Sequence, residues 1–369
     1  MITIVHIAKP VGGVGVYINL LSRFINNQSF KNIVLCNTND AIIDLVDKKN
    51  NLIEVYHIDI EREINFKNDI RCFKQIVDHL KKINPNIIHC HSAKAGILGR
   101  IAGKKLKIST LYTPHAYSYL SADSSRKKWL FKKIEQVFKY FPSKTLACST
   151  SEYNRTIADL KFKKKKVVLW NNSVENNFHL KEYNAILPEK YICSIGRPSY
   201  QKNTELLIQS IYQLKKLIPD IHLVILGAGH YSPELENVRN SIINFKLENN
   251  ITIINWLERS ELLYVLKKSD LYISTSRYEG LPYALIEALA LSKACVVTNV
   301  DGNKDLVINK NNGFLVNLKP KEISEKIFSI LNNEELKKQM EEISEKMFNK
   351  NFDIETNILS LEQIYLQSV

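Results

Sequence analysis

The sequence predicts an α/β fold made of two Rossmann-like, doubly wound domains that face each other across a cleft. The chain has 369 residues, more than one ordinary hydrophobic core organises. Short β-branched runs alternate with amphipathic helical patterns, as in parallel βαβ units. This alternation stops at a polar, Asn-rich segment, residues 171–187, and then starts again. The carboxyl ends of both sheets should border the cleft, where such folds bind their ligands.

The first domain is expected over residues 1–170. It opens with the strand-like run ITIVHI, which a Gly-rich turn connects to the helical pattern of VGVYINLLSRFI. Later apolar runs end in polar, Gly or Pro residues, as strands that lead into loops do. These runs are FKNIVLCN, NIIHCHS, STLYTPH and KTLACST. Helical patterns lie between them, for example NDIRCFKQIVDHLKKI, in which apolar residues recur with a period near 3.6.

Residues 171–187 are expected to form a linker, and residues 188–350 a second domain of the same kind. Its strand-like runs are KYICSIGRPS, HLVILGAGH, NITIINW, DLYISTS, ACVVTN and GFLVN. Helices are expected over residues 203–217, 232–247, 259–268, 281–291 and 320–349. A last helix, at about residues 352–369, should pack back on the first domain.

Composition argues against several classes of protein. The chain contains no run of about 18 apolar residues that could span a bilayer. The N-terminal MITIVHIAKPVGGVGVYI reads as a first strand rather than a signal peptide. The cysteines form no CxxC or His-Cys cluster, which indicates a reducing, cytoplasmic location and no structural zinc site. They are Cys36, Cys72, Cys90, Cys148, Cys193 and Cys295.

The net charge of +13 is unevenly distributed. Residues 1–170 hold 29 Lys and Arg against 13 Asp and Glu, a net +16, and residues 171–369 hold 22 against 25, a net −3. Such asymmetry suggests that the first half meets an anionic membrane surface or another polyanion. The basic runs are RKKWLFKK (126–133), KFKKKK (161–166) and GKKLKI (103–108).

The run at 126–133 suits a helix that touches lipid, because Trp and Leu flanked by Lys are typical of interfacial surfaces. Each cation near an anionic bilayer contributes about 1 kcal/mol, so several would hold the protein peripherally at the cytoplasmic face of the inner membrane. The alternative is a solvated, Lys-rich surface. No nucleic-acid-binding module is recognisable, so no nucleic-acid partner is expected. The residues expected on the membrane or acceptor side are Lys127, Lys128, Trp129, Phe131, Lys132 and Lys133.

Two loops of the second domain carry groups suited to a diphosphate. In SIGRPSYQKN, Arg197 can bind oxygens bidentately and Lys202 provides a point charge. In HLVILGAGH, Gly227 and Gly229 permit a ligand to approach the backbone closely. No complete GxGxxG and no Walker sequence occurs, so NAD and ATP sites lack their fingerprints. The alternatives are a solvated basic loop and an ordinary turn between strand and helix.

The stretch YEGLPYALIEALA, residues 278–290, is the strongest single feature. Pro282 fits a first helical turn, where its missing N–H costs nothing. The N–H groups of that turn and the helix dipole together favour an anion. Glu279 precedes this helix and Glu287 follows eight residues later, and carboxylates are good acceptors for the vicinal hydroxyls of a sugar or a ribose. The alternative makes Glu279 a charge at the helix dipole and Glu287 a surface residue.

Histidines follow two predicted strands of the first domain. His115 comes after STLYTP, at the expected carboxyl edge of the sheet, where a structural and a functional role are about equally open. His89 and His91 are two residues apart and would suit a metal. Because the sequence shows no clear third ligand, we interpret them as strand-end or cleft-lining residues.

Together these stretches resemble the retaining glycosyltransferases of family 4, which have the GT-B fold. Glu279 and Glu287 match the Glu-x7-Glu signature of that family, after GRPSYQKN, GAG and NW in the same order. In the first half, the Gly-rich turn, HCHSAKAGILGRIAG and TPHAYSY are similar as well. The chain departs from the family at Asn172-Ser173, where Asn-Gly is usual, and at Asn255, where Gly is common. The subset with HSAKAGILGR and TPHAY looks like bacterial enzymes that build capsule, lipopolysaccharide O-antigen or exopolysaccharide.

The resemblance implies a role for each motif residue. Arg197 and Lys202 would bind the donor diphosphate, and the amides of Gly280, Leu281 and Pro282 would hold its β-phosphate. Glu279 would accept hydrogen bonds from donor-sugar hydroxyls, and Glu287 from ribose hydroxyls. His115 would face the donor sugar or the reaction centre, so the catalytic set would be Glu279, His115, Arg197 and Lys202. The other donor-binding residues would be Gly13, Gly227, Gly229, Trp256 and Leu257.

The expected function is transfer of a hexose or N-acetylhexosamine from a nucleotide-diphosphate sugar to a glycan or lipid-linked glycan, with retention at the anomeric carbon. The donor is expected to be UDP-linked, with a GDP-sugar as the alternative. No Asp-x-Asp is present to hold a divalent cation, so neither a metal nor another cofactor is expected. Two other functions stay open: another GT-B enzyme, such as a nucleotide-sugar epimerase or a sugar phosphorylase, and a non-catalytic basic protein that binds membrane or nucleic acid.

Overall fold

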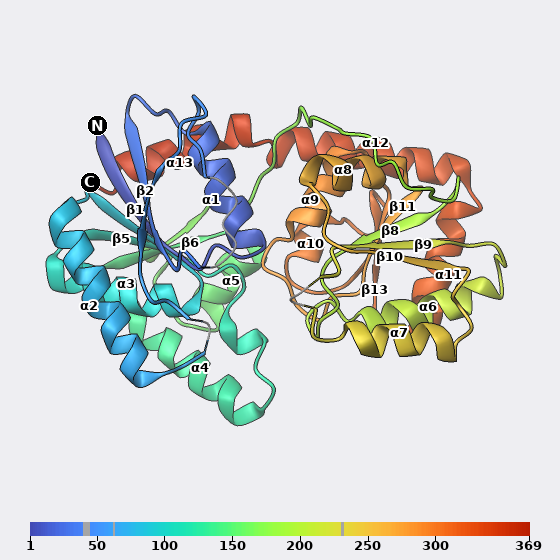
Figure 1. Ribbon diagram of the computed structural model, residues 1–369, viewed down its shortest axis with the longest axis horizontal. Coiled ribbons are helices and arrows are strands. Elements are labelled where there is room, and N and C mark those ends of the chain that lie inside the picture. Colours follow the sequence, from blue (N-terminus) through green and yellow to red (C-terminus); the bar gives the residue numbers. More distant parts are fainter. Residues whose placement is uncertain (40–44, 62, 230–231) are drawn as a thin grey trace. The chain divides into compact units, whose positions relative to one another are not determined.

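The structure is a computed structural model that describes residues 1–39, 45–61, 63–229 and 232–369 (Figure 1). The chain forms two compact units, the first from Met1–Ser173 with Ile354–Val369, and the second from Val174–Asp353. Each unit contains one parallel β-sheet with helices packed on it, so the predicted pair of Rossmann-like domains is confirmed. The boundary between Ser173 and Val174 divides the segment 171–187 between the two units.

The sheet of the first unit has seven parallel strands in the order β3-β2-β1-β4-β5-β6-β7. The chain adds strands on one side of β1 and then on the other, so the topological switch point lies between β1 and β4. The strands are β1 (Ile2–Ile7), β2 (Phe30–Cys36), β3 (Glu54–His57), β4 (Ile87–His91), β5 (Ser109–Thr113), β6 (Ser143–Ala147) and β7 (Val167–Leu169).

Side-chain caps explain where several helices of this unit begin. Asn65 accepts a hydrogen bond from the backbone N–H of Asn68 at the start of α2, and Ser124 and Ser149 cap α4 and α5 in the same way. The last helix, α13, belongs to this unit and packs beside α1. The helices are α1 (Gly13–Phe24), α2 (Phe66–Ile83), α3 (Ala93–Leu106), α4 (Ser125–Val137), α5 (Thr150–Ala158) and α13 (Ile354–Leu366).

Helix α3 lies unusually close to the sheet because small residues face it. A Cβ atom added to Gly99 would lie 2.2 Å from Cys90 Sγ on β4, and one added to Gly96 would lie 2.2 Å from a ring carbon of Tyr112 on β5. Next to Gly99 on the helix, Arg100 is buried and donates from Nη2 to Glu135 Oε2 of α4 at 2.9 Å. Two buried charges are tolerated here because they form an ion pair, and Tyr112 donates a further hydrogen bond to Glu135 at 2.9 Å.

The sheet of the second unit has six parallel strands in the order β10-β9-β8-β11-β12-β13, with its switch point between β8 and β11. Its strands are β8 (Ile192–Ile195), β9 (Leu223–Leu226), β10 (Ile251–Ile254), β11 (Leu271–Ser274), β12 (Cys295–Thr298) and β13 (Gly313–Val316). Its helices are α6 (Thr204–Lys215), α7 (Leu235–Asn244), α8 (Arg259–Lys268), α9 (Tyr283–Ala290), α10 (Asn303–Leu306), α11 (Pro320–Leu331) and α12 (Glu334–Asn351).

The helical stretch predicted over residues 320–349 is two helices rather than one. The chain leaves the helical conformation at Asn332 and Asn333, and the side chain of Asn333 accepts a hydrogen bond from Leu336 N at 2.9 Å. This cap starts α12 anew because Asn competes well for the free N–H groups of a helix start.

All six cysteines are buried and free, as small apolar side chains would be. Burial raises the pKa of the Cys90 thiol to about 12, so this group stays protonated. Among the helices described, none is both long enough and apolar enough to cross a bilayer.

We predict that Gly99→Ala destabilises the first unit by about 1–3 kcal/mol, because its new methyl group would force α3 away from β4. The higher helix propensity of Ala opposes this by about 1 kcal/mol at most. Urea unfolding of the variant measures the difference. Lys105→Ala, an exposed substitution on the same helix, should change stability by no more than about 0.5 kcal/mol. A Gly99→Ala protein as stable as the wild type would show that α3 has room to move.

Candidate functional site

The predicted donor-binding residues of the second unit lie at one edge of its sheet. Parallel strands end at the same edge, and β10, β9, β8 and β11 are neighbours in the sheet. The loop after each strand carries one predicted group. These groups are Trp256 and Leu257 after β10, Gly227 and Gly229 after β9, Arg197 and Lys202 after β8, and Glu279 after β11.

At the switch point of this sheet, Lys202 and Glu279 form an ion pair. Lys202 Nζ lies 2.7 Å from Glu279 Oε1, which also accepts a hydrogen bond from Ser276 Oγ at 2.6 Å. Glu279 Oε2 accepts from Gln201 Nε2 at 3.1 Å. The carboxylate is only 6% exposed, whereas the Lys202 side chain is 25% exposed. The ion pair therefore holds the buried carboxylate of Glu279 in place and leaves the cation of Lys202 partly accessible to solvent.

Two glycines make room for this pair. Gly196 has a φ of 152°, and a Cβ there would lie 2.9 Å from Lys202 Cε, so the lysine stem crosses directly over the backbone. Gly302 has a φ of 80°, and a Cβ there would lie 2.7 Å from the carbonyl oxygen of Gly280. The sequence analysis did not identify either residue. A signal for Gly302 is its position in the loop after β12, next to β11 in the sheet.

The helix after Glu279 begins later than predicted. Helix α9 starts at Tyr283, and Pro282 precedes it in an extended conformation with φ −73° and ψ 122°. Pro282 therefore ends the loop instead of forming the first helical turn. Because proline has no N–H, only the amides of Gly280 and Leu281 in this tripeptide can face an anion, so the expected role of the Pro282 amide is wrong.

Glu287 is buried in α9, so the alternative that places it on the surface is wrong. Its side chain is 8% exposed, and its Oε1 lies 2.9 Å from Arg259 Nη2 at the start of α8. Burial raises the pKa of Glu287 above its usual value, and the positive charge of Arg259 opposes that rise. The approach is too oblique for a hydrogen bond, and Nε and Nη2 of Arg259 have no hydrogen-bond partner in the described part of the chain. Arg259 was not predicted from the sequence.

The other predicted donor residues of this unit are accessible. Trp256 is 74% exposed, Arg197 is exposed and Leu257 is half-buried. Gly229 faces open space, because no atom lies within 4 Å of a Cβ placed there. Gly227 has a φ of 91°, a conformation that glycine adopts without strain.

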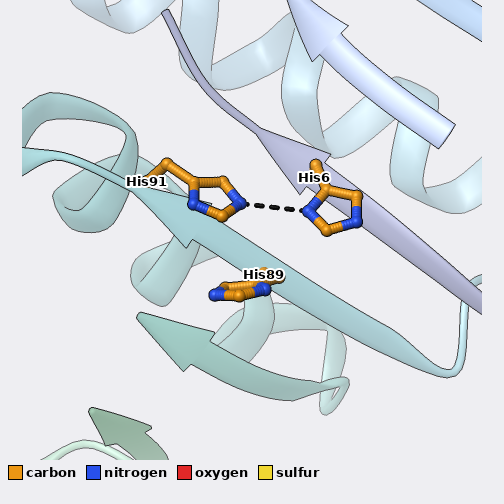
Figure 2. A group of neighbouring side chains, drawn as sticks. All are labelled: His6, His89 and His91. Atoms are coloured by element: carbon orange, nitrogen blue, oxygen red, sulfur yellow. Dashed lines mark hydrogen bonds between the residues drawn. The ribbon is translucent and has the colours of Figure 1, made fainter. Parts of the chain in front are cut away.

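In the first unit, a cluster of histidines fills the switch point between β1 and β4. His6 pairs with His89 across these strands, and His91 lies on the same face two residues further along β4. Figure 2 shows His6 and His91 joined by a hydrogen bond, with His89 beside them. His6 Nδ1 lies 3.0 Å from His91 Nε2, and His91 Nδ1 lies 3.1 Å from Nε2 of His115, which follows β5.

The expectation that no third ligand lies near His89 and His91 is wrong, because His6 supplies one. One nitrogen from each of the three rings lies within 4.8 Å of the others. However, all six ring nitrogens already have hydrogen-bond partners. His89 contacts Thr113 Oγ1 and Tyr365 Oη, both at 2.8 Å, and His6 Nε2 contacts Asn32 Oδ1 at 3.1 Å. A metal ion would have to break this network, so the cluster fits a hydrogen-bonded core better than a metal site.

Burial keeps these imidazoles uncharged. It lowers the pKa of His6 to about 4, and those of His89 and His91 lie well below 6.5 for the same reason. The side chain of His115 is only partly accessible to solvent, and its burial among neighbouring groups lowers its pKa to about 3. The cluster is therefore neutral at physiological pH.

The loop that carries His115 is held in an uncommon conformation. His115 and Ala116 have φ values of 53° and 75°, which non-glycine residues seldom adopt and which store strain. Glu152 of α5 is buried and accepts a hydrogen bond from Ala116 N at 3.0 Å, which fixes the turn. Gly13, the first residue of α1, is exposed and follows the loop after β1. Gly13 at the start of α1 and His115 in the loop after β5 thus both follow strands of one sheet, and Glu152 is a supporting residue that was not predicted from the sequence.

Helix α4 presents apolar and basic side chains to solvent. Trp129, Leu130 and Val137 are 62%, 48% and 55% exposed. Lys127, Lys128 and Lys133 are exposed as well, and Lys127 Nζ lies 2.8 Å from Asp123. Phe131 and Lys132 are half-buried instead: Phe131 packs against the core, and Lys132 Nζ lies 4.0 Å from Asp159.

The buried histidines predict acid-sensitive stability. In the unfolded chain they bind protons below about pH 6.5, whereas the folded forms stay neutral down to lower pH, about 4 for His6. The free energy of unfolding should therefore keep its full value above pH 6.5. Below pH 6.5 it should decrease by about 1.4 kcal/mol per pH unit for each such histidine. Urea unfolding at pH 7.5, 6.0 and 5.0 measures this slope.

His89→Gln should reduce that slope, and His179→Gln, which changes an exposed histidine, should not. Equal slopes in the wild type and His89→Gln would mean that the folded protein protonates this ring.

Known proteins resemble this chain over most of its length. Residues 11–178 match the family model for Glycosyltransferase Family 4, and residues 176–347 match that for Glycosyl transferases group 1. The UDP-Gal:alpha-D-GlcNAc-diphosphoundecaprenol alpha-1,3-galactosyltransferase of Escherichia coli is 26% identical over 306 residues, which cover 79% of this chain and 77% of the relative. The capsular polysaccharide biosynthesis glycosyltransferase CapM of Staphylococcus aureus is 24% identical, with 88% of this chain and 89% of CapM covered.

Solved structures share the fold. Sucrose-phosphate synthase from Thermosynechococcus elongatus matches with a TM-score of 0.84 at 17% identity, over 100% of this chain and 99% of that one. HepE from Anabaena, in complex with UDP and glucose, matches with a TM-score of 0.82 at 16% identity, over 100% of both chains. Both sheets, the order of the motifs and the two family models therefore agree, and the chain belongs to the family 4 glycosyltransferases with the GT-B fold.

Proposed function

We propose that this glycosyltransferase moves a hexose or N-acetylhexosamine from a UDP-sugar to a glycan or lipid-linked glycan during synthesis of a bacterial surface polysaccharide, with retention at the anomeric carbon. The observation that carries the proposal is the Lys202–Glu279 pair at the switch point of the second sheet. The name of the Escherichia coli relative supports a UDP-sugar donor and a diphosphoundecaprenol-linked acceptor, and that of CapM supports a capsular product.

The charges at this edge suit the departure of a nucleoside diphosphate. Transfer breaks the bond between the anomeric carbon and the phosphate oxygen, so negative charge grows on the leaving group. Lys202, held by its pair with Glu279, and the exposed Arg197 are cations that would stabilise this charge, assisted by the backbone at the start of α9. These cations supply positive charge without a resident metal, and we propose a metal-independent reaction.

Glu279 and Glu287 would then recognise hydroxyl groups. Glu279 forms an ion pair with Lys202 at this edge of the sheet. A sugar hydroxyl that reaches this edge can donate a further hydrogen bond to the Glu279 carboxylate. Glu287 is held against Arg259 one helical turn into α9, where it would accept from the ribose. Gly227, Gly229, Trp256 and Leu257 would contact the rest of the nucleotide, and Gly13 and His115 of the first unit would also contact substrate.

We predict that Lys202→Ala and Glu279→Ala each lower turnover of a UDP-sugar by about 10²–10³-fold, the range for loss of one group that stabilises transition-state charge. Radiolabelled UDP-sugars with a membrane glycolipid extract as acceptor provide the assay, and thermal shift shows whether the nucleotide still binds. Lys337→Ala is the matched control. Lys337 forms another ion pair of this unit, with its Nζ 2.9 Å from Asp270. Asp270 precedes β11, whereas Glu279 follows it, so this pair lies at the opposite end of the strand.

Full activity in both site variants would reject the proposed site. Donor consumed without acceptor would favour an epimerase, a need for phosphate would favour a phosphorylase, and an inverted product would reject retention.

We further propose that α4 attaches the protein to an anionic membrane, where a lipid-linked acceptor would lie. Trp129, Lys133 and Val137 are spaced four residues apart and share one exposed face of the helix. An exposed apolar side chain with flanking cations is the composition of an interfacial helix. Since Lys132 faces Asp159, Lys128 and Lys133 are the better candidates for lipid contact.

We predict that Lys128→Glu with Lys133→Glu lowers co-sedimentation with phosphatidylglycerol-containing vesicles at least tenfold, because each cation near the bilayer is worth about 1 kcal/mol. Lys48→Glu with Lys49→Glu makes the same charge change elsewhere in the first unit and should bind as the wild type does. Equal binding of the wild type to neutral and anionic vesicles would contradict the proposal.

A further inference from the structure

Four side chains of the first unit form a continuous row of hydrogen bonds. Asn32 Oδ1 on β2 lies 3.1 Å from His6 Nε2 on β1, and His6 Nδ1 lies 3.0 Å from His91 Nε2 on β4. His91 Nδ1 in turn lies 3.1 Å from His115 Nε2 in the loop after β5. We call this row, from Asn32 through His6 and His91 to His115, the imidazole row. The bond between its two central rings is drawn in Figure 2.

The imidazole row has a direction, and Asn32 sets it. A neutral imidazole has one N–H donor and one lone-pair acceptor. The amide oxygen of Asn32 can only accept, so His6 carries its proton on Nε2 and accepts at Nδ1. His91 must then donate from Nε2 and accept at Nδ1, and His115 must donate from Nε2. The outer nitrogen of His115, Nδ1, is left with a lone pair.

The rings of the imidazole row have this direction only when they are uncharged, and burial keeps them uncharged. His6 and His91 are fully buried, which favours their neutral forms. Across the described residues, Nδ1 of His115 has no hydrogen-bond partner, and the His115 side chain is partly accessible. The rings of Tyr17 and His115 make a T-shaped contact with centroids 4.8 Å apart, which restricts rotation of the imidazole.

We propose that Asn32, His6 and His91 are positioning residues that hold His115 as a neutral hydrogen-bond acceptor for a substrate hydroxyl. The proposal rests on the proposed glycosyl transfer. It also defines what His115 contacts: a sugar hydroxyl can donate to Nδ1, whereas the oxygens of an ionised diphosphate have no proton to donate and are disfavoured there. His115 would thus select a hydroxyl-bearing part of a substrate over a diphosphate.

Removal of the Asn32 oxygen should reverse the row. In Asn32→Leu, a proton on His6 Nε2 would be buried without an acceptor, which costs free energy. Moving it to Nδ1 lets His6 donate to His91, His91 donate to His115, and His115 carry its proton on Nδ1. Nδ1 of His115 then changes from a hydrogen-bond acceptor to a donor. A substrate hydroxyl that donates its proton to Nδ1 therefore loses its acceptor.

The direct test is the tautomer of His115, read from ¹⁵N chemical shifts and two-bond ¹H couplings of ¹⁵N-histidine-labelled protein at pH 7.5. His115→Gln identifies the signal among the nine histidines of the chain. The wild type should show the proton on Nε2, and Asn32→Leu should show it on Nδ1. This measurement needs no substrate, so it stays informative if the protein proves to transfer no sugar. The same His115 tautomer in both proteins would overturn the proposal.

The kinetic test is a double-mutant cycle between Asn32 and His115. Asn32→Leu should lower kcat/KM for the UDP-sugar about tenfold, the range for one lost hydrogen bond. If Asn32 acts through His115, the substitution Asn32→Leu should lower kcat/KM little further in a His115→Ala background. Equal losses in both backgrounds would mean that Asn32 serves only the fold, and the proposal would fail.

Two controls separate positioning from damage to the core. Ile33→Val changes the neighbouring buried residue on β2 and should leave both the His115 tautomer and kcat/KM unchanged. Circular dichroism and the unfolding midpoint show whether Asn32→Leu folds. If it does not, His6→Phe replaces it, since this change also breaks the row between Asn32 and His91 and should alter the His115 tautomer. A stoichiometric metal ion bound by His6, His89 and His91 would exclude the row and overturn the proposal.

Discussion

Parallel pairing of the strands is the constraint on which both candidate sites depend. Residues far apart in the chain meet because each strand ends at the same edge of its sheet. In the second unit this brings Lys202, after β8, within 2.7 Å of Glu279, after β11, although 77 positions separate them. In the first unit it brings His6 of β1 beside His91 of β4, 85 positions away. Both meetings occur at a switch point, where neighbouring strands lead into loops that diverge.

The two sites solve the same electrostatic problem in opposite ways. The second unit places charged groups close to solvent and pairs them, so that its buried carboxylates keep a cation within 3 Å. The first unit buries three imidazoles fully and that of His115 in part, places no countercharge beside them among the described residues, and keeps them neutral. A region of fixed charge suits an ionised diphosphate, and a neutral, directional region suits the hydroxyls of a sugar.

The sequence predicted the alternation of strands and helices well, because the apolar period changes clearly between them. It also predicted which loops carry polar groups, since parallel strands fix the edge at which those loops emerge. It could not predict that His6 joins His89 and His91, because strand order is a property of the whole sheet and no local pattern encodes it. Arg259 was missed for a similar reason: its ion pair with Glu287 depends on how α8 and α9 pack together, which no local pattern encodes. The break between α11 and α12 was readable in principle, because Asn332 and Asn333 interrupt the pattern.

The last helix completes the first unit from the far end of the chain. Helix α13 buries Ile354, Ile358, Leu361 and Tyr365 against that unit, and the Tyr365 hydroxyl lies 2.8 Å from His89 Nδ1. During synthesis, residues 1–173 leave the ribosome before this helix exists, and the entire second unit must follow first. The nascent first unit therefore carries an open apolar surface and an incomplete hydrogen-bond network throughout that interval. The docking of α13 is thus a late event, and the hydrogen bonds of the histidine core are complete only after the second unit has been synthesised.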